Sequence, residues 1–175
     1  REGRSTGSAR SQYLALCRLL PKTGKELLLP MTGVTVPAHL LVGANTREKV
    51  IAEVDAMLAE RRPEKSLQPV VRMLALWIRQ MLVEGTAQAQ DPSDRTIETY
   101  LTRIGGTLVE WMGNSSLVDL DEVEVEEAYL AAIMTGKTNR SQAAAAVLDF
   151  HRCAKRHFDF PDAELGEVMS YLKST

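Results

Sequence analysis

The stretch that decides the fold is residues 91–112, which read DPSDRTIETYLTRIGGTLVEWM. Its apolar residues recur at intervals of three and four, which is the period of a helix with one buried face. They are Ile97, Tyr100, Leu101, Ile104, Leu108, Trp111 and Met112. Ser93 or Asp94 is expected to cap the N-terminus, and Gly113 is expected to end the helix in the left-handed conformation. The stretch therefore predicts a helix over residues 95–112.

Two adjacent glycines, Gly105 and Gly106, lie inside this predicted helix. Two glycines lower helix propensity by about 2 kcal/mol relative to alanine, so the sequence needs a compensating reason for them. Either another part of the chain packs closely there or a ligand does. We favour a close crossing of a second helix.

Helical periodicity continues on both sides of this stretch. Further helices are predicted over residues 13–20, from Thr46 to before Pro63, over 67–83, 122–134 and 140–158, and after Pro161. Residues 21–45 are rich in Pro and Gly, which excludes helix over most of them and leaves short strands or extended loop at 27–29 and 34–36. The sequence thus predicts a mainly α protein. It divides into a tail or linker over residues 1–12, a helical region of unknown role over 13–85, and a helical domain over 91–175.

Composition limits the chemistry that the chain can perform. Hydrophobic residues make up 45% and aromatic residues 5%, so the core must be mostly aliphatic. The sequence contains no phosphate loop, no Gly-x-Ser-x-Gly, no Gly-x-Gly-x-x-Gly and no His-Glu-x-x-His motif. We therefore expect no cofactor and no catalysis in this chain. We also expect no membrane span, because no apolar run reaches about 20 residues.

Cysteine and histidine usage points to an intracellular protein without a metal site. Cys17 and Cys153 are the only cysteines and lie far apart, so we expect both as reduced thiols. His151, Cys153 and His157 lie close in sequence, but no second ligand pair accompanies them, and a structural zinc site needs paired ligands. We interpret them as ordinary side chains of one helix.

Charge is distributed unevenly along the chain. Residues 1–90 hold 13 Lys and Arg against 8 Asp and Glu, while residues 91–175 hold 8 against 15, which gives the net charge of −2. The acidic residues of the second part gather between Asp119 and Glu127. Between Lys137 and Arg156 the balance reverses. An acidic and a basic face on one domain fit a protein that touches DNA on one side, although a dipolar surface without a partner has the same pattern.

The order of helices from residue 91 onward resembles the core-binding, SAM-like domain of tyrosine recombinases of the phage-integrase type. The residues that carry the resemblance are Ser93, Thr96, Tyr100, Trp111, Gly113, Leu117, Leu120, Ala128, Tyr129, Leu130, Asn139, Arg140, Ser141, Leu148 and Phe150. It covers about 70 of the 175 residues. The resemblance implies a bundle of four to five helices, preceded here by the N-terminal helical segment and the irregular Pro/Gly-rich region. The Gly105-Gly106 pair and the low basic content depart from the family.

The resemblance also implies which residues face DNA. By analogy, the first and last helices of the domain lie across the major groove. The implied DNA-binding residues are Arg95, Thr96, Thr99, Arg103, Lys137, Thr138, Asn139, Arg140, Ser141, Arg152, Lys155 and Arg156. Such contacts are mostly to phosphates, which position the domain and carry little base readout.

The implied function is non-catalytic DNA binding beside the crossover site during integration and recombination. The family's catalytic Arg, His and Tyr set is missing, since no His-x-x-Arg occurs. Because the chain also lacks an initiating Met, we expect a segment of a longer, prokaryotic recombinase whose catalytic domain lies beyond Thr175. Implied partners are double-stranded DNA, that catalytic domain and sister protomers, in the cytoplasm at the nucleoid.

The rival interpretation is a helical protein–protein interaction domain without DNA binding. One basic surface joining Arg103, Arg140, Arg152 and Arg156 would favour DNA. Those arginines scattered, or paired with the acidic cluster, would favour the rival.

Overall fold

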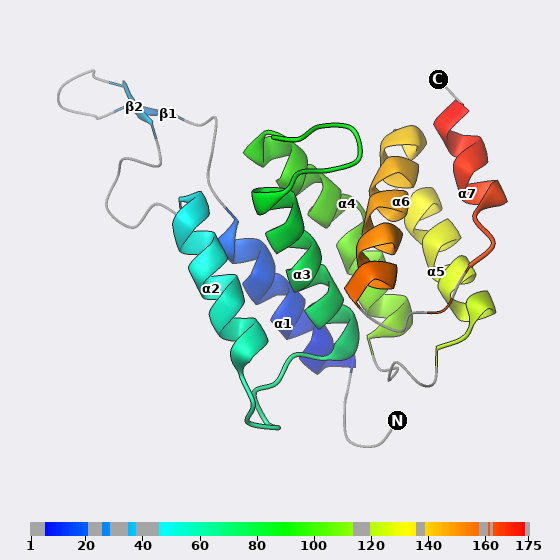
Figure 1. The fold of residues 1–175 in the computed structure, drawn as a ribbon, viewed down its shortest axis with the longest axis horizontal. Coiled ribbons are helices and arrows are strands. Elements are labelled where there is room, and N and C mark those ends of the chain that lie inside the picture. The colour runs from blue at the N-terminus through cyan, green and yellow to red at the C-terminus, as the bar shows by residue number, and fades with distance from the viewer. Residues whose placement is uncertain are drawn as a thin grey trace.

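The computed structural model describes residues 6–20, 26–28, 35–37, 46–113, 120–135, 139–157, 161 and 163–173. Its elements in chain order are α1 (Thr6–Leu19), β1 (Glu26–Leu28), β2 (Thr35–Pro37), α2 (Arg47–Ala59), α3 (Pro69–Val83), α4 (Asp94–Met112), α5 (Glu122–Thr135), α6 (Arg140–His157), α7 (Gly166–Ser170) and the 3-10 turn η3 (Tyr171–Lys173). The predicted mainly α fold is confirmed. Figure 1 shows α1, α2 and α3 side by side on one side, and α5, α6 and α7 on the other.

Helix α4 is the central element, since it packs against α1, α3, α5 and α6. Its start is as predicted: the Ser93 hydroxyl accepts a hydrogen bond from the Thr96 backbone N–H at 3.1 Å. A hydroxyl in this position satisfies one of the unpaired amides of the first turn. Thr46 caps α2 in the same way, accepting from the Lys49 N–H at 3.2 Å.

The predicted glycine pair in α4 is explained by a tyrosine of α1. A Cβ at Gly105 would lie 2.5 Å from Cε1 of Tyr13, whereas at Gly106 it would lie 3.8 Å from the same ring. The Tyr13 hydroxyl donates to the Leu101 carbonyl at 3.2 Å. The close approach is therefore a crossing helix, as favoured above, and it is made by an aromatic side chain that covers Gly105.

Two expectations for the end of α4 are wrong. Gly113 has φ −62° and is right-handed, so it does not end the helix in the left-handed conformation. Its lack of a side chain serves packing, because a Cβ there would lie 3.1 Å from the Cβ of Ala9. Trp111, assigned to the buried stripe, is 51% exposed. The helical period places Trp111 inside the apolar stripe, but it lies in the last turn of α4, where no described element covers it.

The supposed tail over residues 1–12 is also wrong in part, because α1 begins at Thr6. The buried Ala9 packs near Gly113 of α4. Gln12 donates through Nε2 to the Ser66 carbonyl at 3.0 Å and accepts at Oε1 from the Gln68 N–H at 2.8 Å. These contacts with distant segments stabilise helix where the local sequence is polar.

The regions expected over residues 13–85 and 91–175 share one hydrophobic core. Trp77 of α3 is fully buried and packs with its ring centroid 5.5 Å from that of Phe150 of α6. Its indole N–H donates to Oδ2 of Asp149 at 2.8 Å, and Oδ1 of the same carboxylate accepts from the Ala87 N–H at 3.0 Å. The wide apolar face of α3 is thus buried against α4 and α6.

In the Pro/Gly-rich region the structure has a short antiparallel strand pair. Strands β1 and β2 pair with Leu27 opposite Val36. Figure 1 shows this pair set apart from the helices. The short strands that the sequence allowed at 27–29 and 34–36 are therefore present at 27–28 and 35–36, while residues 29 and 34 lie outside the described part of the chain.

Candidate nucleic-acid interface

The residues implied in DNA binding lie on α4 and at both ends of α6. Those exposed are Arg95, Asn139, Arg140, Arg152, Lys155 and Arg156, and those half-buried are Thr96, Thr99, Arg103 and Ser141. Lys137 and Thr138 lie outside the described residues. Phe158, the last residue of the helix predicted over 140–158, also lies outside the described residues.

The start of α4 presents one of the exposed cations. Arg95 is exposed in the first turn, and within the described residues it has no hydrogen-bonded or ionic partner. The Thr96 hydroxyl lies 2.9 Å from the Ser93 hydroxyl, so it is engaged in the cap. Thr99 follows one turn later and is half-buried. This end of α4 therefore offers a guanidinium beside the positive end of the helix dipole.

Arg103 has a structural partner that the sequence did not reveal. Its Nη1 donates to the Ala132 carbonyl at 2.8 Å and its Nη2 to the Ile133 carbonyl at 2.9 Å. These carbonyls belong to the last turn of α5, where helix carbonyls lack internal partners. Burial, and then the nearby charge of Arg140, lower the pKa of Arg103. Arg103 thus fastens α4 to the end of α5, and a second cation lies near it.

The start of α6 supplies that second cation. Asn139 has φ 59°, a left-handed conformation that asparagine tolerates better than most residues, and its carbonyl accepts from the Ala143 N–H at 3.2 Å. Arg140 follows, exposed and without a hydrogen-bonded or ionic partner in the described part of the chain. Ser141 is half-buried beside it. The first turn of α6 combines an exposed guanidinium and a half-buried hydroxyl.

The far end of α6 is a separate group. Arg152 lies 3.9 Å from Oδ1 of Asp149, and Arg156 lies 3.3 Å from Oε1 of Glu84. Twelve to sixteen residues of helix place these side chains about 18–24 Å along the axis from Arg140. The four arginines therefore do not form one basic surface, and this scatter is the outcome that favours the protein-interaction interpretation. In the described residues their partners are also outside the acidic cluster.

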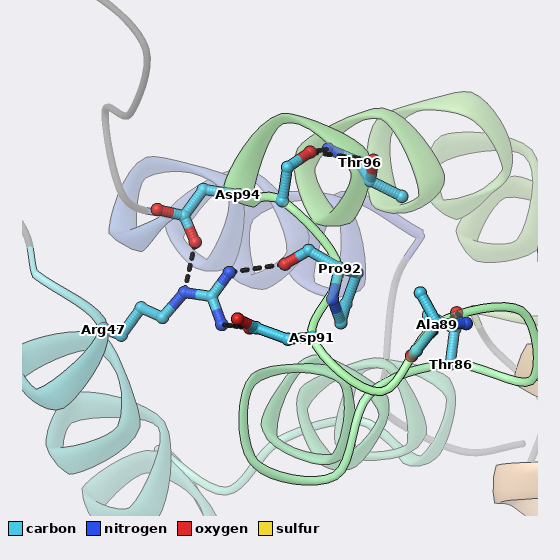
Figure 2. Close-up of polar contacts among 8 residues, drawn as sticks. Arg47, Thr86, Ala89, Asp91, Pro92, Asp94 and Thr96 are labelled. Carbon is cyan, nitrogen blue, oxygen red and sulfur yellow. Dashed lines mark hydrogen bonds and ion pairs between the residues drawn. The ribbon is translucent and has the colours of Figure 1, made fainter.

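The polar cluster at the α3–α4 junction is a feature that sequence reasoning missed (Figure 2). Arg47, the first residue of α2, forms ion pairs with Asp94 and, at 3.0 Å, with Asp91. Its Nη2 donates to the Pro92 carbonyl at 2.5 Å. The partners are more than forty residues away in sequence. The only local signal was the cap at Thr46, which says nothing about where Arg47 reaches.

Tyr129, His151 and Cys153 are packed as part of the core. The Tyr129 hydroxyl and Nδ1 of the buried His151 share a hydrogen bond of 2.7 Å. Burial raises the pKa of the Cys153 thiol to about 12, which keeps it protonated at neutral pH. Within the described ranges no three His, Cys, Asp or Glu side chains converge as a metal site. Nor does any helix there have the length and apolar character to cross a bilayer.

Comparison of the chain with protein-family models, curated proteins and solved structures gave no match. Function is therefore inferred from the chain's own residues and their arrangement.

Proposed function

We propose that this chain is the DNA-binding, non-catalytic part of a site-specific tyrosine recombinase, which grips duplex DNA beside the crossover site. The observation that supports this most is the pair of exposed cations at two helix starts, Arg95 on α4 and Arg140 on α6. Among the described residues neither has a carboxylate partner. We call these two residues, with Thr99, Asn139 and Ser141, the phosphate-binding residues.

Helix starts and arginines recognise the same ligand. The first-turn N–H groups of a helix point outward and carry partial positive charge, so they bind phosphate oxygens. A guanidinium adds two parallel charge-assisted hydrogen bonds to a phosphate. Hydroxyls such as those of Thr99 and Ser141 supply further donors. This set of groups binds the DNA backbone and positions the domain, without reading bases.

Electrostatic repulsion within the protein adds to this. Arg140 contributes, after burial, to the lowered pKa of Arg103, so two like charges lie close together. A phosphate between them would replace repulsion with attraction. Arg152 and Arg156, by contrast, are paired with Asp149 and Glu84, so we assign them no primary role.

Fluorescence anisotropy with a duplex of about 30 base pairs, over a salt series, tests the proposal. Arg95→Ala and Arg140→Ala should each lower the slope of log K against log salt by about 0.9, the value for one phosphate contact. Arg62→Ala is the matched control, since it removes the same charge from an exposed arginine that binds Glu60. It should leave the slope unchanged. Absence of binding at low salt, or equal losses in all three variants, would contradict the proposal.

A second candidate function, a helical protein-interaction domain, is favoured by exposed apolar side chains. Trp111 at the end of α4 is 51% exposed and Val123 at the start of α5 is 61% exposed. Exposed tryptophan is enriched in the energetically dominant parts of protein interfaces. Sedimentation over a concentration series should then show association that Trp111→Ser abolishes. A monomer at all concentrations, together with salt-dependent DNA binding, would leave the DNA-binding function alone.

A further inference from the structure

The start of α4 has two carboxylates close to the arginine that we assign to DNA. Asp94 is the first residue of α4 and Asp91 lies three residues before it. Figure 2 shows Arg47 of α2 reaching toward both carboxylates and the Pro92 carbonyl. Three groups of one guanidinium are used: Nε for Asp94, Nη1 for Asp91 and Nη2 for Pro92. One side chain thus binds the whole segment that leads into α4.

The two carboxylates differ in how strongly they depend on Arg47. The Asp94 side chain is only 10% exposed, and that of Asp91 is 87% exposed. Solvent and salt screen the exposed charge, whereas the covered one is screened much less. An uncompensated Asp94 would therefore project negative potential onto the neighbouring Arg95. The Arg47 side chain is itself only 26% exposed, and its Nε, Nη1 and Nη2 are all engaged in these contacts.

We propose that Arg47 is a positioning residue for DNA binding: it neutralises Asp94 and holds the start of α4 so that the Arg95 guanidinium can donate to a phosphate. This rests on the proposed function. Arg47 does not touch DNA in this arrangement, and it acts through Asp94. The partner recognised remains the duplex backbone.

A double-mutant cycle measured by the same anisotropy assay tests this. Arg47→Gln removes the charge and the contacts with Asp91 and Pro92, because its amide nitrogen reaches only the position of Nε beside Asp94. It should raise Kd about five- to tenfold, the Coulomb effect of one uncompensated charge near a phosphate. Adding Asp94→Asn should return Kd to within about twofold of the wild type, because the charge to be neutralised is gone. Asp94→Asn alone should change Kd by less than about twofold, because Arg47 remains paired with Asp91. Arg47→Lys keeps the charge but cannot make the three separate contacts, so it should raise Kd, though less than Arg47→Gln does.

Asp91→Asn in the Arg47→Gln background is the matched control. It removes the same charge from a carboxylate that binds the same guanidinium but is screened by solvent, so it should restore little affinity. Thermal unfolding of each variant checks that a folded protein is compared.

The outcomes separate this inference from the proposed function. If Arg47 contacted a phosphate directly, the effects of Arg47→Gln and Asp94→Asn would add, and the salt slope would fall by about 0.9; either result overturns the positioning role. If the effects of Arg47→Gln and Asp94→Asn on Kd add, while Arg95→Ala and Arg140→Ala still lower the salt slope, only the role of Arg47 is overturned. Absence of DNA binding by the wild-type chain would overturn both.

Discussion

The contact between Tyr13 and Gly105 makes a sharp prediction, because the neighbouring Gly106 is a matched control in the same helix. In both positions Gly→Ala gains about 1 kcal/mol of helix propensity. At Gly106 the new Cβ meets the Tyr13 ring at 3.8 Å, an ordinary van der Waals contact. Gly106→Ala should therefore stabilise the fold by about 0.5–1 kcal/mol.

At Gly105 the same methyl group would lie 2.5 Å from Cε1 and 3.0 Å from Cζ of Tyr13. The optimal carbon–carbon separation is about 3.5–4.0 Å, so the ring must move by about 1 Å. Tyr13 is buried and its hydroxyl binds the Leu101 carbonyl, so the ring has no free space to swing into. Overpacking costs about 1–3 kcal/mol and loss of the hydrogen bond about 1 kcal/mol. After the propensity gain, Gly105→Ala should destabilise by about 1–3 kcal/mol.

Urea unfolding followed by circular dichroism at 25 °C measures both variants. Tyr13→Leu provides the test of cause, because a shorter side chain no longer reaches Gly105. In that background the cost of Gly105→Ala should fall to zero or change sign. Equal stability of the two alanine variants, or a cost at Gly105 that persists without the tyrosine, would refute the reasoning.

Three further predictions concern the core, the cap and alkaline pH. Asp149→Ala should lower the free energy of unfolding in urea by about 2–4 kcal/mol, because it leaves the Trp77 indole N–H unpaired. Asp55→Ala, which breaks the exposed ion pair with Arg79, should lower it by less than about 1 kcal/mol. Similar losses in the two variants would contradict the assigned burial of Asp149. Ser93→Ala should cost about 1 kcal/mol through loss of the α4 cap, and no change would show that the cap is dispensable. Burial raises the pKa of Cys153 to about 12. The unfolded chain therefore releases this proton first, and stability present below about pH 9 should fall as pH rises toward 12, by about 2–3 kcal/mol at pH 11 for this group. Thermal unfolding of Cys153→Ala should be less sensitive to pH over that range.

The sequence by itself determined what depends on neighbours along the chain. The bounds of α4, its cap at Ser93 and the buried positions from Ile97 to Leu108 follow from helical periodicity and capping chemistry. The cap of α2 at Thr46 follows from the same rules. So does the mainly α fold, because these signals act over three or four residues. Gly105 and Gly106 predicted a close contact, but they did not predict that Tyr13 makes it.

Only the tertiary structure decided which distant groups meet. Tyr13 covers Gly105 because α1 crosses α4, and Trp111 is exposed because no described helix packs over the end of that stripe. The resemblance assigns Arg103 to DNA and the sequence assigns Arg47 no role, yet Arg103 binds the carbonyls of α5 and Arg47 binds the carboxylates before and at the start of α4. The partner of a long, flexible side chain depends on which distant segments pack beside it, and residue spacing along the chain does not predict that partner. The candidate site therefore has fewer residues than the resemblance implied, and these residues lie at the starts of α4 and α6.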